Sequence, residues 1–328
     1  MTFSREVHLI QRPNGALKPE NFEIVETRLD DIEDGQVLVE NIYISIDPSH
    51  RPQMDFQQPL GTVIPSRAVG RVIESKNSTL SVGDLVTSQK GYRDFFVSSE
   101  KGLEKIVLES DIPLTAYMHA FAATGFAAYV GLHYIAQVIS GEQVFVSSAA
   151  GSVGSFAAQI AKIHGCYVVG STGSDEKADW LRNELNLDAV INYKTHPIKQ
   201  SLKEATPNGI DVYFDNVGGE HLEAAINRMN PLGRIPVCGM ISTYNDRNAN
   251  PIPNLWKIIY PRTMIRGFVA HEQVRVYADF QTKMKSWLRD GSVKYKETIM
   301  HGIESAPAAL IGLMEGKNIG KMIVQLTE

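Results

Sequence analysis

Cysteine is scarce in this sequence: the 328 residues contain only Cys166 and Cys238. Both lie in apolar, strand-like stretches, which favours buried free thiols in a reducing compartment. Two cysteines are too few for a four-cysteine zinc lobe, and the nine histidines show no H-x-x-x-H spacing. The sequence therefore predicts no metal site.

Excess charge of either sign is also lacking, since the net charge is -5 and the pI is about 6.0. This balance argues against nucleic acid or an anionic membrane as the main partner. The first ten residues, MTFSREVHLI, lack the apolar core of a signal peptide, so we expect a cytoplasmic protein. No Asp, Glu, Lys or Arg occurs between Asp111 and Glu142, a span long enough to cross a bilayer. Its small residues and turn formers instead predict buried helices at a domain junction.

The length suggests about two domains. Up to about residue 117 the pattern is short strands and turns, which predicts an all-β domain of barrel type. Strands then alternate with helices, as in a parallel, doubly wound sheet. The tail again reads as β structure and is interpreted as returning to the first domain. The predicted class is α/β, with domains 1–117 plus 296–328 and 118–295.

A small-residue turn joins a strand to a helix between Gln143 and Gly165. It has the A-x-G-x-x-G form of a dinucleotide fingerprint. In such turns one glycine lets the backbone approach a pyrophosphate, another lets the helix pack closely on its strand, and free N–H groups at the helix start hold the anion. The predicted cofactor residues here are Ala150, Gly151, Ser152, Val153 and Gly154.

The preference for NAD or NADP depends on residues about twenty positions after the glycine turn. An NAD site usually places an acidic residue there for the ribose 2′-hydroxyl. In this chain residues 170–174 are small and uncharged, and Ser174 with Asp175 is interpreted as a helix cap. Lys177 can meet a 2′-phosphate as a point charge, although a solvated helix lysine is an equally simple interpretation. The missing acid favours NADP(H).

Several segments occur in an order that resembles one enzyme family: SIDPSHR, AAGSVG, GSTGSDEK, NYK, YFDNVGG, CGMISTYN and NIGK. The chain resembles the medium-chain dehydrogenase/reductase superfamily, and within it the zinc-independent branch of prostaglandin reductases, alkenal double-bond reductases and curcumin reductases. Zinc relatives carry Gly-His-Glu where this chain has Pro65-Ser66-Arg67.

The resemblance implies a GroES-like β domain with the substrate cleft, a Rossmann domain holding NADPH, and a homodimer. It also implies further cofactor contacts, which are Gly173, Lys177, Tyr193, Asn216, Gly239, Met240, Phe268, Val269 and Asn318.

One departure concerns the substrate pocket. The family's D-P-Y-M-R loop has Ser49-His50 in place of Tyr-Met, followed by Arg51. The resemblance places these three residues in the pocket, which is then expected to be wider and more polar. The substrate and the proton donor stay open.

The predicted reaction is NADPH-dependent, metal-independent reduction of the C=C bond of an α,β-unsaturated ketone or aldehyde, by hydride transfer to the β-carbon. Tyr244 is the candidate donor to the carbonyl oxygen or acid for the α-carbon, because an unperturbed phenol is protonated at neutral pH. Water, a ribose hydroxyl or His50 are alternatives. Two other functions are an NADPH quinone reductase and a non-catalytic NADPH-binding redox sensor.

Overall fold

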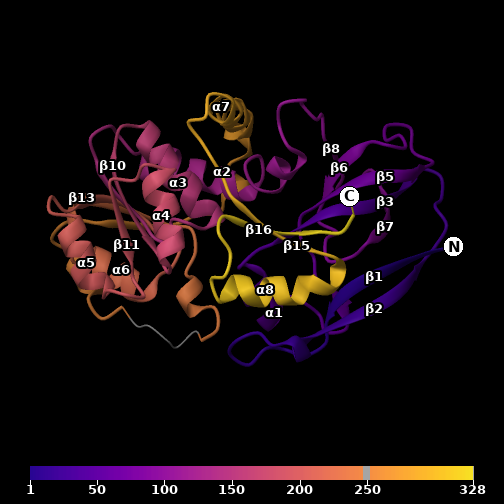
Figure 1. The fold of residues 1–328 in the computed structure, drawn as a ribbon, viewed down its shortest axis with the longest axis horizontal. Coiled ribbons are helices and arrows are strands. Elements are labelled where there is room, and N and C mark those ends of the chain that lie inside the picture. Colours follow the sequence, from indigo (N-terminus) through magenta and orange to yellow (C-terminus); the bar gives the residue numbers. More distant parts are fainter. Residues whose placement is uncertain (247–251, 328) are drawn as a thin grey trace. The chain divides into compact units, whose positions relative to one another are not determined.

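Two units make up the chain in the computed structural model, which describes residues 1–246 and 252–327 (Figure 1). Unit 1 comprises Met1–Met118 and Glu297–Glu328, and unit 2 is the continuous segment His119–Lys296. The boundaries expected from sequence, after residues 117 and 295, each precede these by one residue. The mixed α/β class is confirmed by an antiparallel sheet domain and a parallel sheet domain.

Unit 1 is built on two mainly antiparallel sheets. The smaller has the order β2-β1-β4, and the larger the order β15-β16-β3-β5-β6-β8, with β7 also paired to β3. Among the named strands of unit 1 that the structure describes, β15 and β16 are the parallel pair. The elements are β1 (Thr2–Leu9), β2 (Phe22–Leu29), β3 (Gln36–Ile46), α1 (His50–Phe56), β4 (Thr62–Val63), β5 (Ala68–Ser75), β6 (Leu85–Ser88), β7 (Phe95–Ser99), β8 (Glu104–Lys105), β15 (Glu297–His301), α8 (Ala306–Met314) and β16 (Lys321–Gln325).

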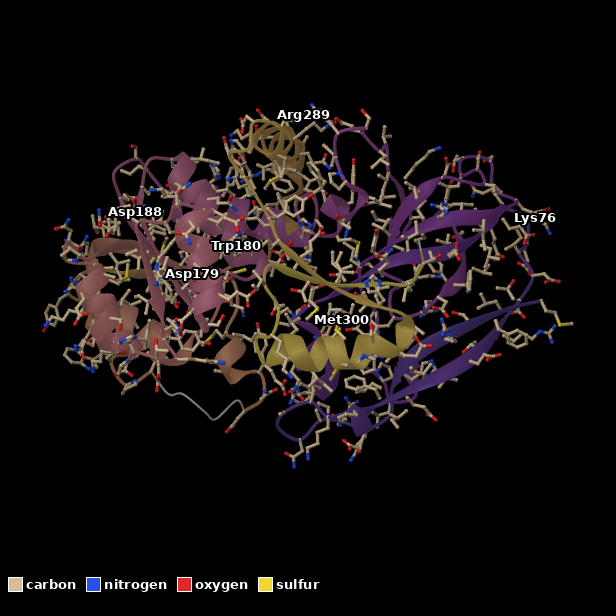
Figure 2. All side chains as sticks on the ribbon, in the orientation of Figure 1. Lys76, Asp179, Trp180, Asp188, Arg289 and Met300 are labelled. Atoms are coloured by element: carbon tan, nitrogen blue, oxygen red, sulfur yellow. The ribbon has the colours of Figure 1, made fainter. Side chains whose placement is uncertain are left out.

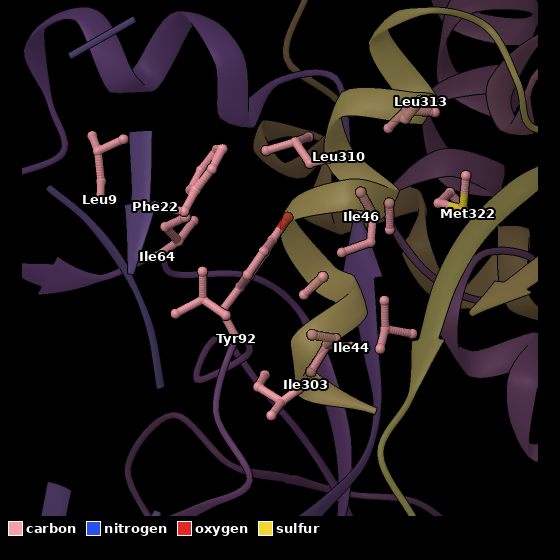
Figure 3. Packing of buried hydrophobic residues seen from close by; sticks show 14 of the residues in the cluster. Leu9, Phe22, Ile44, Ile46, Ile64, Tyr92, Ile303, Leu310, Leu313 and Met322 are labelled. Carbon is pink, nitrogen blue, oxygen red and sulfur yellow. The ribbon is translucent and has the colours of Figure 1, made fainter. Parts of the chain in front are cut away.

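The main core of unit 1 joins segments from both ends of the chain (Figure 3). Leu9 and Ile44 come from the N-terminal part, and Leu310 and Val324 from the C-terminal part, and all four are fully buried. At about 25 cal/mol per Å² of apolar surface removed from water, such contacts make the returning segment an integral part of this unit.

Unit 2 carries one parallel sheet with the strand order β11-β10-β9-β12-β13-β14. This is the doubly wound order of a dinucleotide-binding fold, with the strand order reversing between β9 and β12. The elements are α2 (Ala123–Val130), β9 (Gln143–Val146), α3 (Ser152–Ile163), β10 (Tyr167–Thr172), α4 (Asp175–Asn183), β11 (Ala189–Asn192), α5 (Ile198–Ala205), β12 (Ile210–Phe214), α6 (Gly219–Ile226), β13 (Met229–Val237), β14 (Met264–Gly267) and α7 (Tyr277–Arg289).

Helix amphipathicity explains how the helices cover this sheet. On α4, Trp180 is buried while the adjacent Asp179 is exposed (Figure 2). Helix α3 differs, because the eight consecutive residues 154–161 are all buried. It packs against α2 as well as against β9 and β10, so it is enclosed on more than the one face that the sequence pattern predicted.

The charge-poor segment after Asp111 forms short helical pieces, among them α2. Within the part of the chain that the structure describes, no helix combines the length and apolar character needed to cross a membrane.

Candidate nucleotide and catalytic site

The predicted glycine turn lies between β9 and α3, at the carboxyl end of β9. Gly151 is the N-cap of α3 in an extended conformation, and no side chain caps the free amides of the helix. A Cβ built on Gly154 would lie 2.2 Å from the Ser148 carbonyl oxygen. Only glycine therefore lets α3 begin this close to the turn, as the fingerprint requires.

Polar groups at the start of α3 are left without protein partners. The Ser152 hydroxyl is buried and has no hydrogen-bond partner among the described residues. A phosphate oxygen at this position would satisfy both the hydroxyl and the uncapped amides. Ala150 lines the turn as a buried small residue, and Val153 is half-buried on the first helical turn. The residues present fit a pyrophosphate.

The carboxyl end of β10 carries the second part of the site. Ser174 is the N-cap of α4 and accepts from the Lys177 backbone N–H, so the predicted cap is observed. A Cβ on Gly173 would lie 3.1 Å from the Tyr193 hydroxyl and 3.3 Å from Lys194 Cε. These side chains thus converge on Gly173.

Two cations meet at this strand end. Burial, and then the like charge of Lys194, lowers the pKa of Lys177. Two like charges held together, with no carboxylate in residues 170–174, form a site suited to a dianion such as a ribose 2′-phosphate. Lys194 is the last residue of the NYK motif, and the sequence alone assigned no role to it. A lysine beside a predicted phosphate contact is the signal that could have identified it.

The carboxyl ends of β12 and β13 form the third part. Asn216 donates from its side-chain amide to the Ser147 carbonyl oxygen at 2.7 Å, which ties the end of β12 to that of β9. A Cβ on Gly239 would lie 3.2 Å from the Tyr244 hydroxyl. Met240 packs its side chain against Gly218, where a Cβ would lie 2.8 Å from Met240 Cε. The four strands whose carboxyl ends carry these residues are neighbours in the order β10-β9-β12-β13.

Tyr244 follows the short helical turn Ile241–Thr243. The Met240 backbone N–H donates to its phenolic oxygen at 3.4 Å. Burial raises the pKa of Tyr244. The phenol therefore keeps its proton at neutral pH and can donate it.

Phe268 and Val269 directly follow β14. The Phe268 ring contacts Phe214 edge-on at 6.3 Å between centroids, and a Cβ on Gly131 would lie 2.9 Å from Phe268 Cζ. Val269 is exposed and its backbone is extended, and its carbonyl oxygen accepts from the Glu272 amide at 3.3 Å.

Four of the predicted site residues belong to unit 1. Asn318 is buried and donates to the Gly320 carbonyl oxygen at 2.7 Å. Ser49 is exposed, whereas His50 and Arg51 are buried in α1. Their roles toward cofactor and substrate stay predictions.

The inward residues of α1 have protein partners. Arg51 lies 2.6 Å from Asp55 and donates to the Gly15 carbonyl oxygen at 2.9 Å. His50 Nδ1 lies 3.4 Å from the Tyr92 hydroxyl. Burial lowers the pKa of His50 to about 4, despite the opposing effect of Asp47. A histidine that is neutral at pH 7 is a poor proton donor, which leaves Tyr244 as the stronger candidate.

A buried ion pair beside His50 was missed. Lys321 is 2% exposed, and its ammonium lies 2.6 Å from Asp47 Oδ1 and 2.9 Å from the Ile46 carbonyl oxygen. Burial would raise the pKa of Asp47, but Lys321 and His50 lower it to about 2. The pair joins β16 to the end of β3. The residues are 274 positions apart, so no local pattern reveals it.

Possible metal ligands are scattered through the described part of the chain. Among residues 1–246 and 252–327, no group of three or more His, Cys, Asp or Glu side chains is placed to hold an ion. Both cysteines are free, and burial raises the pKa of the Cys166 thiol to about 11 and of the Cys238 thiol to about 12.

Comparisons with known proteins bear on this geometry. A family model described as the N-terminal domain of oxidoreductase matches residues 5–106, and one described as zinc-binding dehydrogenase matches residues 152–286. Prostaglandin reductase 1 of Bos taurus is 40% identical over 310 residues, covering 93% of this chain and 94% of that protein. The chain belongs to the zinc-independent branch of the medium-chain dehydrogenase/reductase superfamily.

Other members of the branch are similar over the full length. The (+)-pulegone reductase of Mentha piperita is 38% identical and covers 100% of this chain and 99% of its own. The crystal structure of CurA from Vibrio vulnificus in complex with NADPH has a TM-score of 0.92 at 33% identity, covering 99% of both chains. The predicted family is thus confirmed by both sequence and fold.

Proposed function

We propose that this protein is an NADPH-dependent, metal-independent reductase of the C=C bond of α,β-unsaturated ketones and aldehydes. The observation that carries the proposal is the arrangement at the carboxyl ends of the parallel strands of unit 2. An anion-binding turn, a pair of lysines and a protonated tyrosine follow these strand ends. The similar prostaglandin, pulegone and 2-alkenal reductases support the substrate class.

Each part of the cradle takes one portion of NADPH. The turn from Ala150 to Gly154 holds the pyrophosphate on backbone amides. The 2′-phosphate is held by Gly173, Lys177 and Tyr193, with Lys194 as an additional contact. The nicotinamide side is lined by the remaining predicted contacts of unit 2, which are Asn216, Gly239, Met240, Phe268 and Val269. In unit 1, Asn318 is the predicted cofactor contact.

When bound, NADPH supplies the hydride that reaches the β-carbon of the substrate. Negative charge then develops on the carbonyl oxygen. Tyr244 stabilises this charge by donating its O–H, and a positioned donor of this kind contributes about 3 kcal/mol to lowering the barrier. The Met240 amide fixes the phenol by donating to its oxygen, which leaves the phenolic proton for the substrate.

Substrate selection is assigned to the turn around Ser49. Ser49 presents a small exposed side chain, whereas His50 and Arg51 point into unit 1 and hold α1 in place. A pocket with serine at this position accepts bulkier or more polar enones. Ser49→Tyr is expected to raise KM for a bulky enone more than for a small one.

The proposed function is tested by NADPH consumption with a conjugated enone, with NADH in parallel and with metal-stripped protein. A saturated ketone formed with NADPH supports the proposal. An allylic alcohol refutes the hydride position, and reduction of quinones alone refutes the substrate class.

Tyr244→Phe is the matching variant, and Tyr167→Phe is its control because Tyr167 is the first residue of β10, at the opposite end of the strand from the proposed site. We expect kcat to fall roughly a hundredfold for Tyr244→Phe, consistent with about 3 kcal/mol, and to stay unchanged for the control. Unchanged turnover of Tyr244→Phe removes Tyr244 from the chemistry.

We also propose a cytoplasmic homodimer that pairs through β14. This strand ends the sheet of unit 2, so its outer edge has no partner strand among the described residues. Large apolar side chains are exposed on and near it. They are Leu232, Leu255, Trp256, Ile259, Tyr260 and Met264. An unpaired edge beside an apolar surface is suited to pairing across a two-fold axis.

A further inference from the structure

One carboxylate oxygen gathers the hydrogen bonds at the end of β12. Asp215 is fully buried, and its Oδ1 accepts from the Tyr213 hydroxyl at 2.6 Å, the Val217 amide at 2.9 Å and the Gly218 amide at 2.8 Å. The Ser147 hydroxyl lies 3.4 Å from the same oxygen. Burial raises the pKa of Asp215, and the hydrogen bonds from these donors oppose that effect.

Ser147 extends this network to β9. Its hydroxyl lies 3.0 Å from the Tyr213 hydroxyl, to which it can donate, and its oxygen accepts from the Asn216 backbone N–H at 2.9 Å. The Asp215 carboxylate therefore shapes the turn after β12 and joins it to the strand that leads into the pyrophosphate cradle.

The loop that carries Tyr244 is folded on this same turn. The backbone carbonyls of residues 215–217 accept hydrogen bonds from the amides of residues 238–242. The pairs are Cys238 N to Asp215 O at 2.8 Å, Gly239 N to Asp215 O at 3.1 Å, Ile241 N to Asn216 O at 3.3 Å and Ser242 N to Val217 O at 3.1 Å. The Ser242 hydroxyl also donates to the Val217 carbonyl oxygen at 2.6 Å.

The chemistry of the network calls for an acidic side chain. Every close partner of Oδ1 is a donor, and a carboxylate is an acceptor without a competing donor. Asp215 Oδ2 is buried and has no hydrogen-bond partner among the residues that the structure describes. An asparagine would place its NH₂ either in that unpaired position or against the amides of Val217 and Gly218, and both arrangements are unfavourable.

We propose that Asp215 is a positioning residue for the nicotinamide end of the site. It does not touch the reacting atoms. It holds the turn 216–218, and through that turn the loop 238–244, so that the Tyr244 phenol is fixed. The statement that Asp215 positions the nicotinamide end of the site rests on the proposed function. The proposed 2′-phosphate contacts, on β10, β11 and α4, are a separate part of the site.

Asp215→Asn is the test, and Asp211→Asn is its matched control. Asp211 lies at the other end of β12 and also accepts from a backbone amide, that of Gln143, at 2.8 Å. We expect Asp215→Asn to lower kcat at least tenfold, while affinity for adenosine 2′,5′-bisphosphate stays within twofold of wild type. Asp211→Asn should change neither quantity.

A second readout needs no turnover. In the apo protein, hydrogen exchange within residues 216–218 and 238–244 should be at least tenfold faster in Asp215→Asn but not in Asp211→Asn. The fluorescence of bound NADPH, which reports the nicotinamide surroundings, should change only in Asp215→Asn. These measurements decide the proposal even if wild-type protein reduces no enone, an outcome that would refute the proposed function alone.

The proposal is overturned if folded Asp215→Asn keeps wild-type exchange in these loops, or if it loses bisphosphate affinity as severely as kcat. Should Asp215→Asn fail to fold, Tyr213→Phe removes one donor to Oδ1 and is expected to act in the same direction with a smaller effect. Wild-type exchange and wild-type NADPH fluorescence in that variant would likewise overturn the proposal.

Discussion

Gly154→Ala changes a single hydrogen to a methyl group at the closest approach of α3 to its turn. The added carbon would lie 2.2 Å from Ser148 O, 2.8 Å from Ser148 C and 2.9 Å from Ala149 Cα. All three are backbone atoms, so no side chain can rotate away. Overpacking of this kind costs about 3 kcal/mol at its upper range. Alanine returns about 1 kcal/mol through helix propensity, which leaves a net loss of about 2 kcal/mol.

Thermal unfolding and NADPH titration measure this effect. A loss of about 2 kcal/mol corresponds to roughly 4–8 °C in Tm for a domain of this size. NADPH affinity should also weaken several-fold, because the start of α3 must move. The control is Gly312→Ala in α8, where the nearest atom to the new Cβ is Lys317 Cδ at 3.6 Å. Propensity alone acts there, so stability should rise by up to about 1 kcal/mol. Wild-type stability and NADPH affinity for Gly154→Ala would refute the close-approach argument.

Three further predictions follow from the site and the sheet edge. Lys177→Ala and Lys194→Ala should each reduce the preference for NADPH over NADH, as a ratio of kcat/KM, by at least about tenfold, since a charged hydrogen bond contributes roughly 1.5–3 kcal/mol; an unchanged ratio would exclude that lysine from the 2′-phosphate site. His50 has a pKa of about 4 in the folded protein against about 6.5 unfolded, so the unfolded state binds the extra proton and stability falls as pH drops from 6.5 to 4. His50→Met should remove about 3 kcal/mol of this pH dependence in urea unfolding, and a profile identical to wild type would contradict it. Tyr260→Glu should shift the protein from dimer to monomer in analytical ultracentrifugation, whereas a wild-type sedimentation profile would argue against the proposed edge.

Much of the fold was predictable from local sequence patterns. Apolar spacing and small-residue turns predicted α3 and its strand, because burial of one face and close backbone approach both leave marks on neighbouring residues. The parallel order followed from the alternation of strands and helices. The all-round burial of α3 was not predictable in the same way, since it depends on α2 packing on a face that the sequence leaves unspecified.

The residues of the candidate site also divide into those predictable from local motifs and those that depend on tertiary contacts. Gly154, Lys177 and Tyr193 stand in motifs, and the structure brings the Tyr193 hydroxyl toward Gly173 and places Lys177 under the influence of the Lys194 charge. Asp215 reads in sequence as part of a turn, and its network becomes visible only when β9 and β13 lie beside β12. Lys321 pairs with a residue from the other end of the chain. The roles of these buried charged residues depend on partners that are distant in the sequence, so local patterns do not reveal them.

The insertion of β16 between β15 and β3 has a consequence for the order of synthesis. A ribosome completes unit 2 before it makes β16, because this strand of unit 1 follows the whole of unit 2 in the chain. Until then β3 has one unpaired stretch, Asp47 lacks its partner Lys321, and the core in Figure 3 lacks the residues that β16 contributes, among them Met322. The unit that begins first is thus the unit that finishes last, and its nascent strands are the ones that need protection from aggregation.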